Sequence, residues 1–151
     1  MQRTFHLLLL FAGLLRADVT DNLTAYWGYE DDLLDNAASG STNDDGVWQN
    51  GSAANFEAGL LGKDINTNGN AYVIVPNSPD INGNGNLISI SSWFKVTSFN
   101  QGWQCLMSQG EGSKWRIARN GGNDSMAYAG GSPDVRTNTN VNDNQWHHIL
   151  A

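Results

Sequence analysis

Residues 88–96 read ISISSWFKV, and this stretch decides the fold class. Apolar and polar residues alternate along most of it, and a period of two is typical of a β-strand with one buried face. The face that we expect toward the core carries Ile88, Ile90, Phe94 and Val96. The opposite face carries Ser89, Ser91, Trp93 and Lys95. The stretch therefore predicts a half-buried strand whose outer face presents a tryptophan.

Similar short runs recur on both sides of this strand and are separated by turn residues. The other candidate strands cover residues 23–28, 71–75, 103–108, 115–119, 125–129, 135–139 and 146–151. Asn-Gly steps, which favour tight turns because both residues tolerate positive φ, begin at Asn50, Asn68, Asn82, Asn84 and Asn120. No stretch predicts a helix. The pattern predicts an all-β protein with two packed antiparallel sheets, which is a β-sandwich or jelly roll.

Residues 30–51 do not fit the strand pattern. The segment is rich in Asp and Gly, and only Val47 and Trp48 interrupt its polarity. We expect an ordered loop that crosses one end of the sandwich and is closed by Trp48 packing inward.

The composition agrees with a turn-rich β-protein and argues against nucleic-acid binding. The 151 residues contain 19 Asn but three Glu, and Asn favours turns whereas Glu favours helices. Fifteen acidic against eight basic residues give a net charge of −7, whereas binding to phosphates requires a basic face. Six Trp, four Tyr and five Phe exclude a disordered acidic tail, because such tails are poor in aromatic residues.

The first 17 residues predict a signal peptide. Residues 7–15 (LLLLFAGLL) form an apolar run after Arg3 that is as long as a signal-peptide core and much shorter than the ~20 residues of a membrane span. The chain then consists of this signal peptide, 1–17, and one domain, 18–151. Because no later apolar run approaches that length, we expect no membrane insertion of the mature chain and a secreted, extracellular or cell-surface location. The single cysteine, Cys105, lies in an apolar run that predicts a buried free thiol.

Several landmarks taken together resemble a known family. In chain order they are Ala25-Tyr26-Trp27, Glu30-Asp31-Asp32, Gly62-Lys63-Asp64, Tyr72-Val73, the strand at 88–96, and Trp146-His147-His148-Ile149. This order resembles the laminin-G-like jelly-roll domain of the concanavalin A-like lectin/glucanase superfamily, which is pentraxin-related, over residues 23–151. In that family further strands follow the Trp-His-His segment. The resemblance therefore implies a jelly roll that is incomplete at its C-terminus and truncated before its last strands.

The sequence also suggests a calcium site. Residues 64–69 and 80–85 place Asp or Asn at alternate positions before a Gly, as the start of an EF-hand loop does. Neither is an EF-hand, because the twelfth position holds Val75 or Ser91 in place of Glu, so each is either an Asn-stabilised turn or a partial cation site. The resemblance to pentraxins implies ions near residues 109–114. The candidate ligands of a structural or ligand-bridging Ca²⁺ are Asp80, Asn82, Asn84 and Glu111.

The sequence carries no recognisable catalytic pair, and we expect a protein that is not an enzyme. Glucanases of the resembled fold carry a Glu-x-Asp-x-x-Glu strand with two carboxylates on one face, and no such motif occurs here. Glu30 and Asp32 are two residues apart but lie where the resemblance ends the first strand. His147 and His148 face opposite sides of a predicted strand, so they cannot chelate one ion together. We expect one of them to pack in the core with a hydrogen bond to the backbone.

Exposed aromatic rings beside amide side chains predict sugar binding, because an amide can both donate to and accept from hydroxyl groups. The candidate ligand-binding residues are Trp93, Trp103, Trp115, Asn100 and Asn120, with Tyr128, Gln101 and Asn123 as further candidates. The alternative for each ring is that it fills the core. We predict a non-catalytic extracellular recognition module that binds a glycan. The alternatives are a protein-interaction or adhesion module of the same fold and an accessory domain of a larger glycan-active enzyme.

Overall fold

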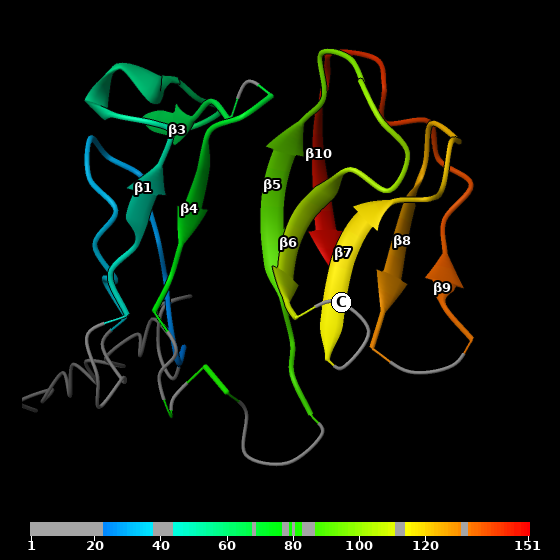
Figure 1. Ribbon diagram of the computed structural model, residues 1–151. Helices are drawn as coiled ribbons and strands as arrows, with labels where there is room; N and C mark the ends of the chain where they lie inside the picture. Colours follow the sequence, from blue (N-terminus) through cyan, green and yellow to red (C-terminus); the bar gives the residue numbers. More distant parts are fainter. Residues whose placement is uncertain are drawn as a thin grey trace, which may run out of the picture.

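The computed structural model describes residues 23–37, 44–67, 69–76, 79, 81–82, 87–110, 114–130 and 133–151. The predicted signal peptide lies outside these ranges. The strands are β1 (Val47–Gln49), β2 (Phe56–Ala58), β3 (Lys63–Ile65), β4 (Tyr72–Ile74), β5 (Ser91–Lys95), β6 (Cys105–Gln109), β7 (Trp115–Arg119), β8 (Met126–Ala129), β9 (Val135–Arg136) and β10 (Trp146–Leu150) (Figure 1). Within the described ranges the single helical element is the 3₁₀ turn Ala53–Asn55, and no helix there could cross a membrane. The prediction of an all-β chain is confirmed.

All the strand pairs are antiparallel. β6, β7, β8 and β9 form a four-stranded meander, while β5 pairs with β10, which follows much later in the chain. β1 pairs with β4, and β2 pairs with β3. In the β5–β10 pair Phe94 lies opposite His147 and Trp93 lies opposite His148. Residues directly opposite in a sheet share a face, so Phe94 and His147 lie on one side of this pair and Trp93 and His148 on the other.

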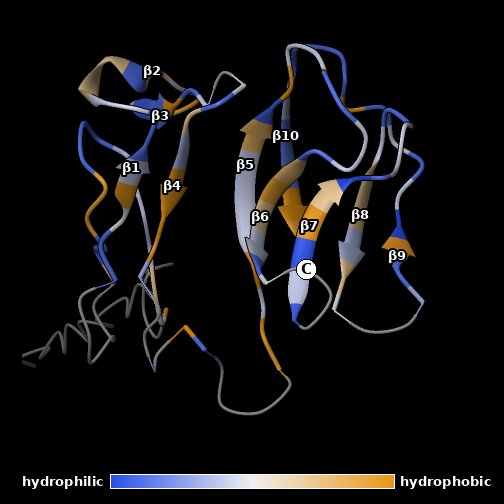
Figure 2. Cartoon of the chain, viewed as in Figure 1, coloured by the Kyte–Doolittle hydropathy of each residue, from blue (hydrophilic) through white to orange (hydrophobic). Residues whose placement is uncertain are grey.

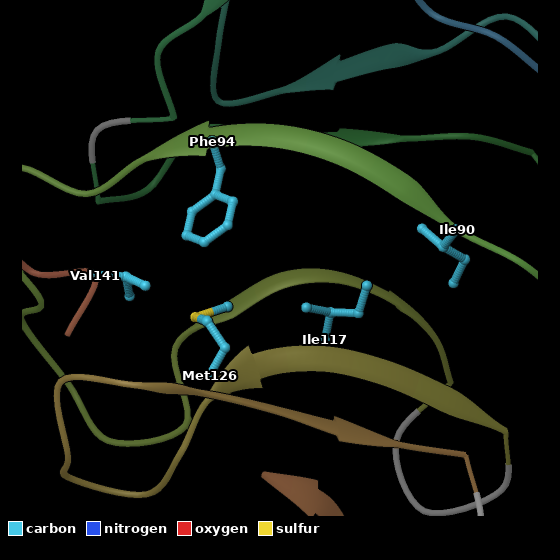
Figure 3. Close-up of a cluster of buried hydrophobic side chains, with 5 residues drawn as sticks. All are labelled: Ile90, Phe94, Ile117, Met126 and Val141. Carbon is cyan, nitrogen blue, oxygen red and sulfur yellow. The ribbon is translucent and has the colours of Figure 1, made fainter. Parts of the chain in front are cut away.

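The apolar core lies between the β5–β10 pair and the four-stranded sheet. Figure 3 shows Ile90 and Phe94 pointing from one layer toward Ile117 and Met126 of the other. Val141 joins the cluster from the segment before β10, and Ile117 is completely buried. Two antiparallel layers around an apolar interior are the arrangement of a β-sandwich.

The predicted alternation holds over residues 90–96, but Ile88, which was predicted to face the core, is exposed because it lies three residues before the first residue of β5. Phe94 is 7% exposed and packs in the core, whereas Trp93 on the opposite face is 55% exposed. β7 coincides with the predicted strand at 115–119, and β4, β8, β9 and β10 fall inside their predicted runs. β6 overlaps the run predicted at 103–108. The sequence pattern therefore located both layers of the sandwich.

The strand predicted at residues 23–28 is wrong. The backbone N–H of Tyr26 donates to the side chain of Asp35 at 2.8 Å, and its carbonyl accepts from Asn36 N at 2.7 Å. Because the Tyr26 N–H donates to a carboxylate and not to a backbone carbonyl, the segment does not form the repeated backbone hydrogen bonds of a strand pair.

The region predicted as one loop, residues 30–51, contains strand β1, which pairs with β4. Trp48 is half-buried and meets Phe56 edge-on, with 5.8 Å between the ring centroids. Strands β2 and β3 form a hairpin that the sequence did not predict, because each strand has three residues and mixed polarity. Residues 38–43 of the predicted loop lie outside the described ranges.

The prediction that Cys105 is buried is also wrong. Its side chain is exposed, and the pairing of β6 with β7 shifts register between Cys105 and Met107. The prediction assumed unbroken alternation along β6, but a bulge changes which face each residue presents. Met107 rather than Cys105 packs against the core.

Candidate functional site

Three connections leave the same end of the sandwich, and we call them the Asn-rich end. It comprises residues 96–104 between β5 and β6, residues 120–125 between β7 and β8, and residues 137–145 between β9 and β10 (upper end in Figure 1). Alternate turns of antiparallel strands lie at the same edge of the layers, which explains why these three meet. Figure 2 shows that these connections are mostly hydrophilic. The asparagines in them are Asn100, Asn120, Asn123, Asn138, Asn140, Asn142 and Asn144.

Arg119, the last residue of β7, joins two of the three loops. Its guanidinium donates to four acceptors, which are Asn123 O (2.8 Å), Gln101 O (2.9 Å), Gly122 O (2.7 Å) and Asp124 Oδ1 (3.4 Å). It also lies over the ring of Phe99, with Cζ 4.6 Å from the centroid, and its side chain is 14% exposed. The planar guanidinium fixes the directions of its donors, so these bonds hold residues 99–101 in place against the 120–125 loop.

Asn142 joins the third loop to the other two. Its Nδ2 donates to Asp124 Oδ1 at 3.1 Å, and its Oδ1 accepts from Phe99 N at 3.3 Å. The neighbouring backbone N–H of Val141 donates to Asp124 O at 2.8 Å, while the Val141 side chain is buried in the core. The loop is therefore anchored both by polar bonds and by apolar packing.

The turn before β10 is fixed by Asp143. Its carboxylate accepts from the ring Nε2 of His147 at 2.9 Å and from Gln145 N at 3.0 Å. Both bonds favour the charged carboxylate and hold the pKa of Asp143 below its usual range, and the bond from His147 is the larger cause. His147 packs on the core side against Phe94, as predicted, but its partner is this carboxylate and not the backbone.

The two histidines face opposite sides, which confirms the prediction that they cannot share one ion. His148 lies against Trp93 on the outer face of the β5–β10 pair, with the ring centroids 5.0 Å apart. Its Nε2 is 2.8 Å from the hydroxyl of Ser91. The Trp93 ring is therefore held in place by its neighbour while more than half of its surface stays exposed.

An open pocket of about 360 Å³ lies at the Asn-rich end. Its lining consists of amide, hydroxyl and carboxylate side chains from two of the loops, namely Asn120, Asn123, Asp124, Ser125, Asn138 and Asn140. Asn120 is fixed by a bond from its Nδ2 to the Ser125 hydroxyl at 3.3 Å, and Asn140 Oδ1 accepts from Asn142 N at 2.9 Å. Asn123 and Asn138 have no side-chain partner among the described residues, so their amides are available to a ligand.

Trp103 lies beside the turn that carries Asn120. Its backbone N–H donates to Gly121 O at 2.9 Å, and its ring runs along Gly121, which adopts the left-handed conformation with φ +59°. Trp103 itself has φ +56°, an unusual value for a bulky residue. Trp103 is 43% exposed, and the guanidinium carbon of Arg116 lies 4.8 Å from the ring centroid. The bond to Gly121 and the unusual backbone therefore hold an aromatic ring against the turn that carries Asn120.

The structure brings together two of the five ligand-binding residues that the sequence predicted, Asn120 and Trp103, whereas the side-chain amide of Asn100 lies beside Gly69 and does not line the pocket. Asn120 lines the pocket, Trp103 flanks its turn, and Asn100 is exposed in the neighbouring loop, where its N–H donates to Gln104 Oε1 at 3.1 Å. Trp93 lies elsewhere, on the outer face of the β5–β10 pair. Trp115 is half-buried against the core, which is the alternative that the sequence left open for these rings.

The residues that organise this site could not be predicted from local sequence patterns, with two exceptions. Arg119 and Asn142 act through backbone carbonyls and N–H groups of distant segments, which no local pattern announces. Asn138 and Asn140 could have been found, because Asn occupies every second position from 138 to 144. Such a run is too polar for a strand interior and indicates an exposed segment rich in hydrogen-bonding groups.

The predicted calcium ligands are mostly outside the described ranges. Asp80, Asn84 and Glu111 fall there, and Asn82 Oδ1 accepts from Gln109 Nε2 at 2.7 Å. Among the residues that the structure describes, no three His, Cys, Asp or Glu side chains gather as a metal site would require. The calcium site stays a prediction.

Comparison with known families places the chain. The family model described as "Concanavalin A-like lectin/glucanases superfamily", of the laminin G type, matches residues 67–151, which include β4 to β10 and the whole Asn-rich end. No curated protein and no solved structure matches the chain. The matched residues cover more than half of the sequence and both layers of the sandwich. The chain therefore belongs to the concanavalin A-like lectin/glucanase superfamily and has the laminin G-like fold of lectin-like and adhesion modules.

Proposed function

We propose that the protein is a non-catalytic recognition module that binds a glycan in the pocket of the Asn-rich end. The observation that carries this proposal is a pocket lined almost entirely by neutral hydrogen-bonding side chains and held by Arg119 and Asn142. Each sugar hydroxyl is both a donor and an acceptor, and each Asn amide offers both functions. A set of amides, two held by hydrogen bonds and two without a side-chain partner in the described structure, is therefore well suited to a ligand covered with hydroxyl groups.

Preorganisation of the loops supports the same proposal. Ordering a flexible side chain on binding costs about 0.5–1.5 kcal/mol. The backbone that presents Asn120 and Asn123 is already fixed by the bonds from Arg119 and by the turn bond from Asn123 N to Asn120 O at 3.0 Å. Less binding energy is then lost to ordering, which matters for a ligand that gains little from apolar burial.

Trp103 supplies the apolar part of the proposed site. The two faces of a sugar ring expose C–H groups, which pack on aromatic rings, and Trp103 lies beside the turn that lines the pocket. We propose that the ligand extends from the amides onto the exposed part of this ring. An extracellular location and an effect of Ca²⁺ on binding are part of the proposal.

The test is a glycan array probed with the protein made in a bacterial host, so that Asn123, which lies in an Asn-Asp-Ser sequon, remains unmodified. The array is probed once with CaCl₂ at about 2 mM, which exceeds the dissociation constants of weak extracellular calcium sites, and once with EDTA. A difference between the two would reveal a contribution of calcium to binding. We expect binding to a subset of glycans, lost in a variant that combines Asn123→Ala and Asn138→Ala. Neither side chain has a hydrogen bond within the described structure, so the melting temperature should not change.

The matched control is Asn36→Ala, since Asn36 is an exposed asparagine far along the chain from these loops. It should bind like the unmodified protein. The proposal is wrong if no glycan on the array binds, or if the pocket variant binds as well as the control.

A second candidate function is binding to another protein, and the exposed apolar face of the β5–β10 pair favours it. On this face Trp93 is 55% exposed and Leu150 is 72% exposed, and Lys95 lies over the ring of Trp146 at 5.2 Å. Exposed aromatic and aliphatic groups with a polar rim are typical of protein interfaces. Binding to an array of extracellular proteins that is lost in Trp93→Ser, together with no binding to glycans, would favour this function over the first.

A further inference from the structure

The charges around the pocket indicate which glycans it can accept. Among its six lining residues, five are neutral and one, Asp124, is acidic, while none is Lys, Arg or His. The Asp124 side chain is 49% exposed, so its carboxylate is open to the pocket side and to solvent. The chain as a whole carries a net charge of −7. An anionic ligand would therefore meet a like charge at the site and a like-charged protein around it.

The cation bonded to Asp124 cannot serve an anionic ligand. A guanidinium has five N–H donors, and Arg119 uses four hydrogen bonds to hold Asn123, Gln101, Gly122 and Asp124. Its side chain is 14% exposed, so a ligand carboxylate could approach it only by displacing the loops that it fixes. The other nearby cation, Arg116, lies over the ring of Trp103 and is not part of the pocket lining.

We infer that the pocket of the Asn-rich end is selective for neutral glycans and excludes glycans whose bound residue carries a carboxylate or a sulfate. This inference rests on the proposed function and adds the class of ligand. Neutral hydroxyl groups find both donors and acceptors in the amides, and they can also donate to Asp124. A carboxylate or sulfate brings acceptors only, and it places its charge beside Asp124 without a basic group in the pocket lining to bind it, since Arg119 is already engaged by the loops and by Asp124.

The test compares neutral oligosaccharides with the same oligosaccharides capped by sialic acid or sulfate, printed on one array at low ionic strength, where charges are weakly screened. We expect the anionic members of each pair to bind at least about tenfold more weakly, because like charges brought together at a binding site are strongly disfavoured. Equal or stronger binding of the anionic members would overturn the inference and leave the proposed function intact. Binding to no glycan of either kind would overturn both.

Two variants separate a local effect of Asp124 from the charge of the whole protein. Asp124→Asn should raise the ratio of anionic to neutral binding, because it removes the carboxylate while keeping an oxygen that can accept from Arg119 and Asn142. The control Asp31→Asn removes one negative charge beside Lys63, in another part of the chain, and Asn tolerates its φ of +66°. The control should leave the ratio unchanged. A ratio that rises equally in both variants, or in neither, would contradict selection by Asp124.

Discussion

Arg119 is the residue on which the geometry of the Asn-rich end depends most. One side chain holds three backbone carbonyls and a carboxylate of two loops, and it is mostly buried. Asn142 holds the third loop through a smaller set of bonds. Neither residue needs to touch a ligand, because each positions the loops that carry the lining residues. Single substitutions can therefore separate positioning from contact.

Replacing Arg119 with Lys should destabilise the protein and weaken glycan binding. Lysine keeps the charge, but all its donors are on one nitrogen. That nitrogen cannot reach the acceptors that lie on different sides of the Arg119 guanidinium. Because hydrogen bonds to a charged group contribute about 1.5–3 kcal/mol, we expect the free energy of unfolding to fall by about 2 kcal/mol. Glycan affinity should fall by about tenfold as the loops lose their order. Urea denaturation and calorimetric titration measure the two effects, and an unchanged affinity would show that the loops do not need Arg119.

The two exposed tryptophans should differ in their effect on glycan binding. Trp103→Ala removes the ring beside the pocket and should weaken binding by about tenfold, the size of one aromatic contact of roughly 1.4 kcal/mol. Trp93→Ala removes a ring on the outer face of the β5–β10 pair and should leave glycan binding unchanged. Both are measured by calorimetric titration with the best neutral glycan of the array. The opposite ranking would place the glycan site on the β5–β10 face.

At the scale of elements, the two layers of the sandwich were predictable and the smaller ladders were not. The alternation at 88–96 and the apolar run at 115–119 identify β5 and β7 because each strand packs one face on the core. β1, β2 and β3 have three residues each and lie in segments of mixed polarity, whereas the equally short β4 lies in the apolar run at 71–75 that revealed it. The exposure of Cys105 follows from a register shift in β6 that depends on its partner strand. Local patterns predict buried faces, whereas short pairings depend on distant partners.

The β2–β3 hairpin contains a pair of like charges that should make stability depend on pH. Glu57 and Asp64 lie directly opposite each other. The pKa of Asp64 is raised, first by burial and then by Glu57, while Lys95 acts in the opposite direction. A carboxyl with a raised pKa binds its proton more tightly in the folded state, so its charge lowers stability above that pKa. This penalty disappears as the pH falls below the unfolded value near 4.

Asp64→Asn should therefore raise the melting temperature at pH 7 by a few degrees at most. The gain should shrink as the pH falls through the raised pKa of Asp64 and should vanish below about 4, where the carboxyl is protonated in both the folded and the unfolded state. Glu57→Gln is the companion variant, and it should produce a smaller gain because Glu57 is the second cause of the shift. Thermal melts followed by circular dichroism measure the melting temperatures of both variants between about pH 4, near the ordinary carboxyl pKa, and about pH 8. A lower melting temperature for Asp64→Asn at pH 7 would show that the charged carboxylate is stabilising.

Asp143 should show the opposite dependence on pH. Its lowered pKa means that its charged form is favoured in the folded state, so its contribution is present above the unfolded value near 4 and is lost as the pH falls further. Asp143→Asn should reduce stability at pH 7 and remove part of the acid-induced loss of stability. Urea denaturation at about pH 7 and about pH 3, on either side of the ordinary carboxyl pKa near 4, gives the free energy of unfolding of the variant and of the unmodified protein. If both proteins lost the same free energy of unfolding between these two pH values, a role for the Asp143 carboxylate would be contradicted.

At the scale of the whole molecule, the core joins the two layers and so supports the site at their end. Ile117 is fully buried between them, and Val141 links the core to the loop that carries Asn140 and Asn142. Ile117→Ala should lower the free energy of unfolding by about 2–5 kcal/mol, the usual range for such a cavity. The matched control Ile74→Ala, at a position that is 45% exposed in β4, should cost less than about 1 kcal/mol. Equal losses in urea denaturation would contradict the placement of the core.

The sequence predicted that Asn-rich end loops would form the site, but it did not predict which side chains hold those loops together. Composition and turn residues indicated Asn-rich end loops, and two of the five predicted binding residues, Asn120 and Trp103, lie at the same turn there. The sequence could not predict which tryptophan lies in the core, which on a sheet face and which beside an end loop. Alternation within one strand does not show which loops of other strands lie next to it. The bonds from Arg119 to distant carbonyls had no signal at all, since every residue carries a carbonyl group.

The central claim is that a neutral glycan binds at the Asn-rich end. It is tested most directly by mapping backbone amide chemical shifts in ¹⁵N-labelled protein while the best neutral glycan of the array is added. The account predicts that the largest shifts occur in residues 119–125 and 137–142, with a smaller response around Trp103 and none around Trp93 and His148. Shifts centred on Trp93 and His148, or no shifts at a saturating glycan concentration, would contradict it.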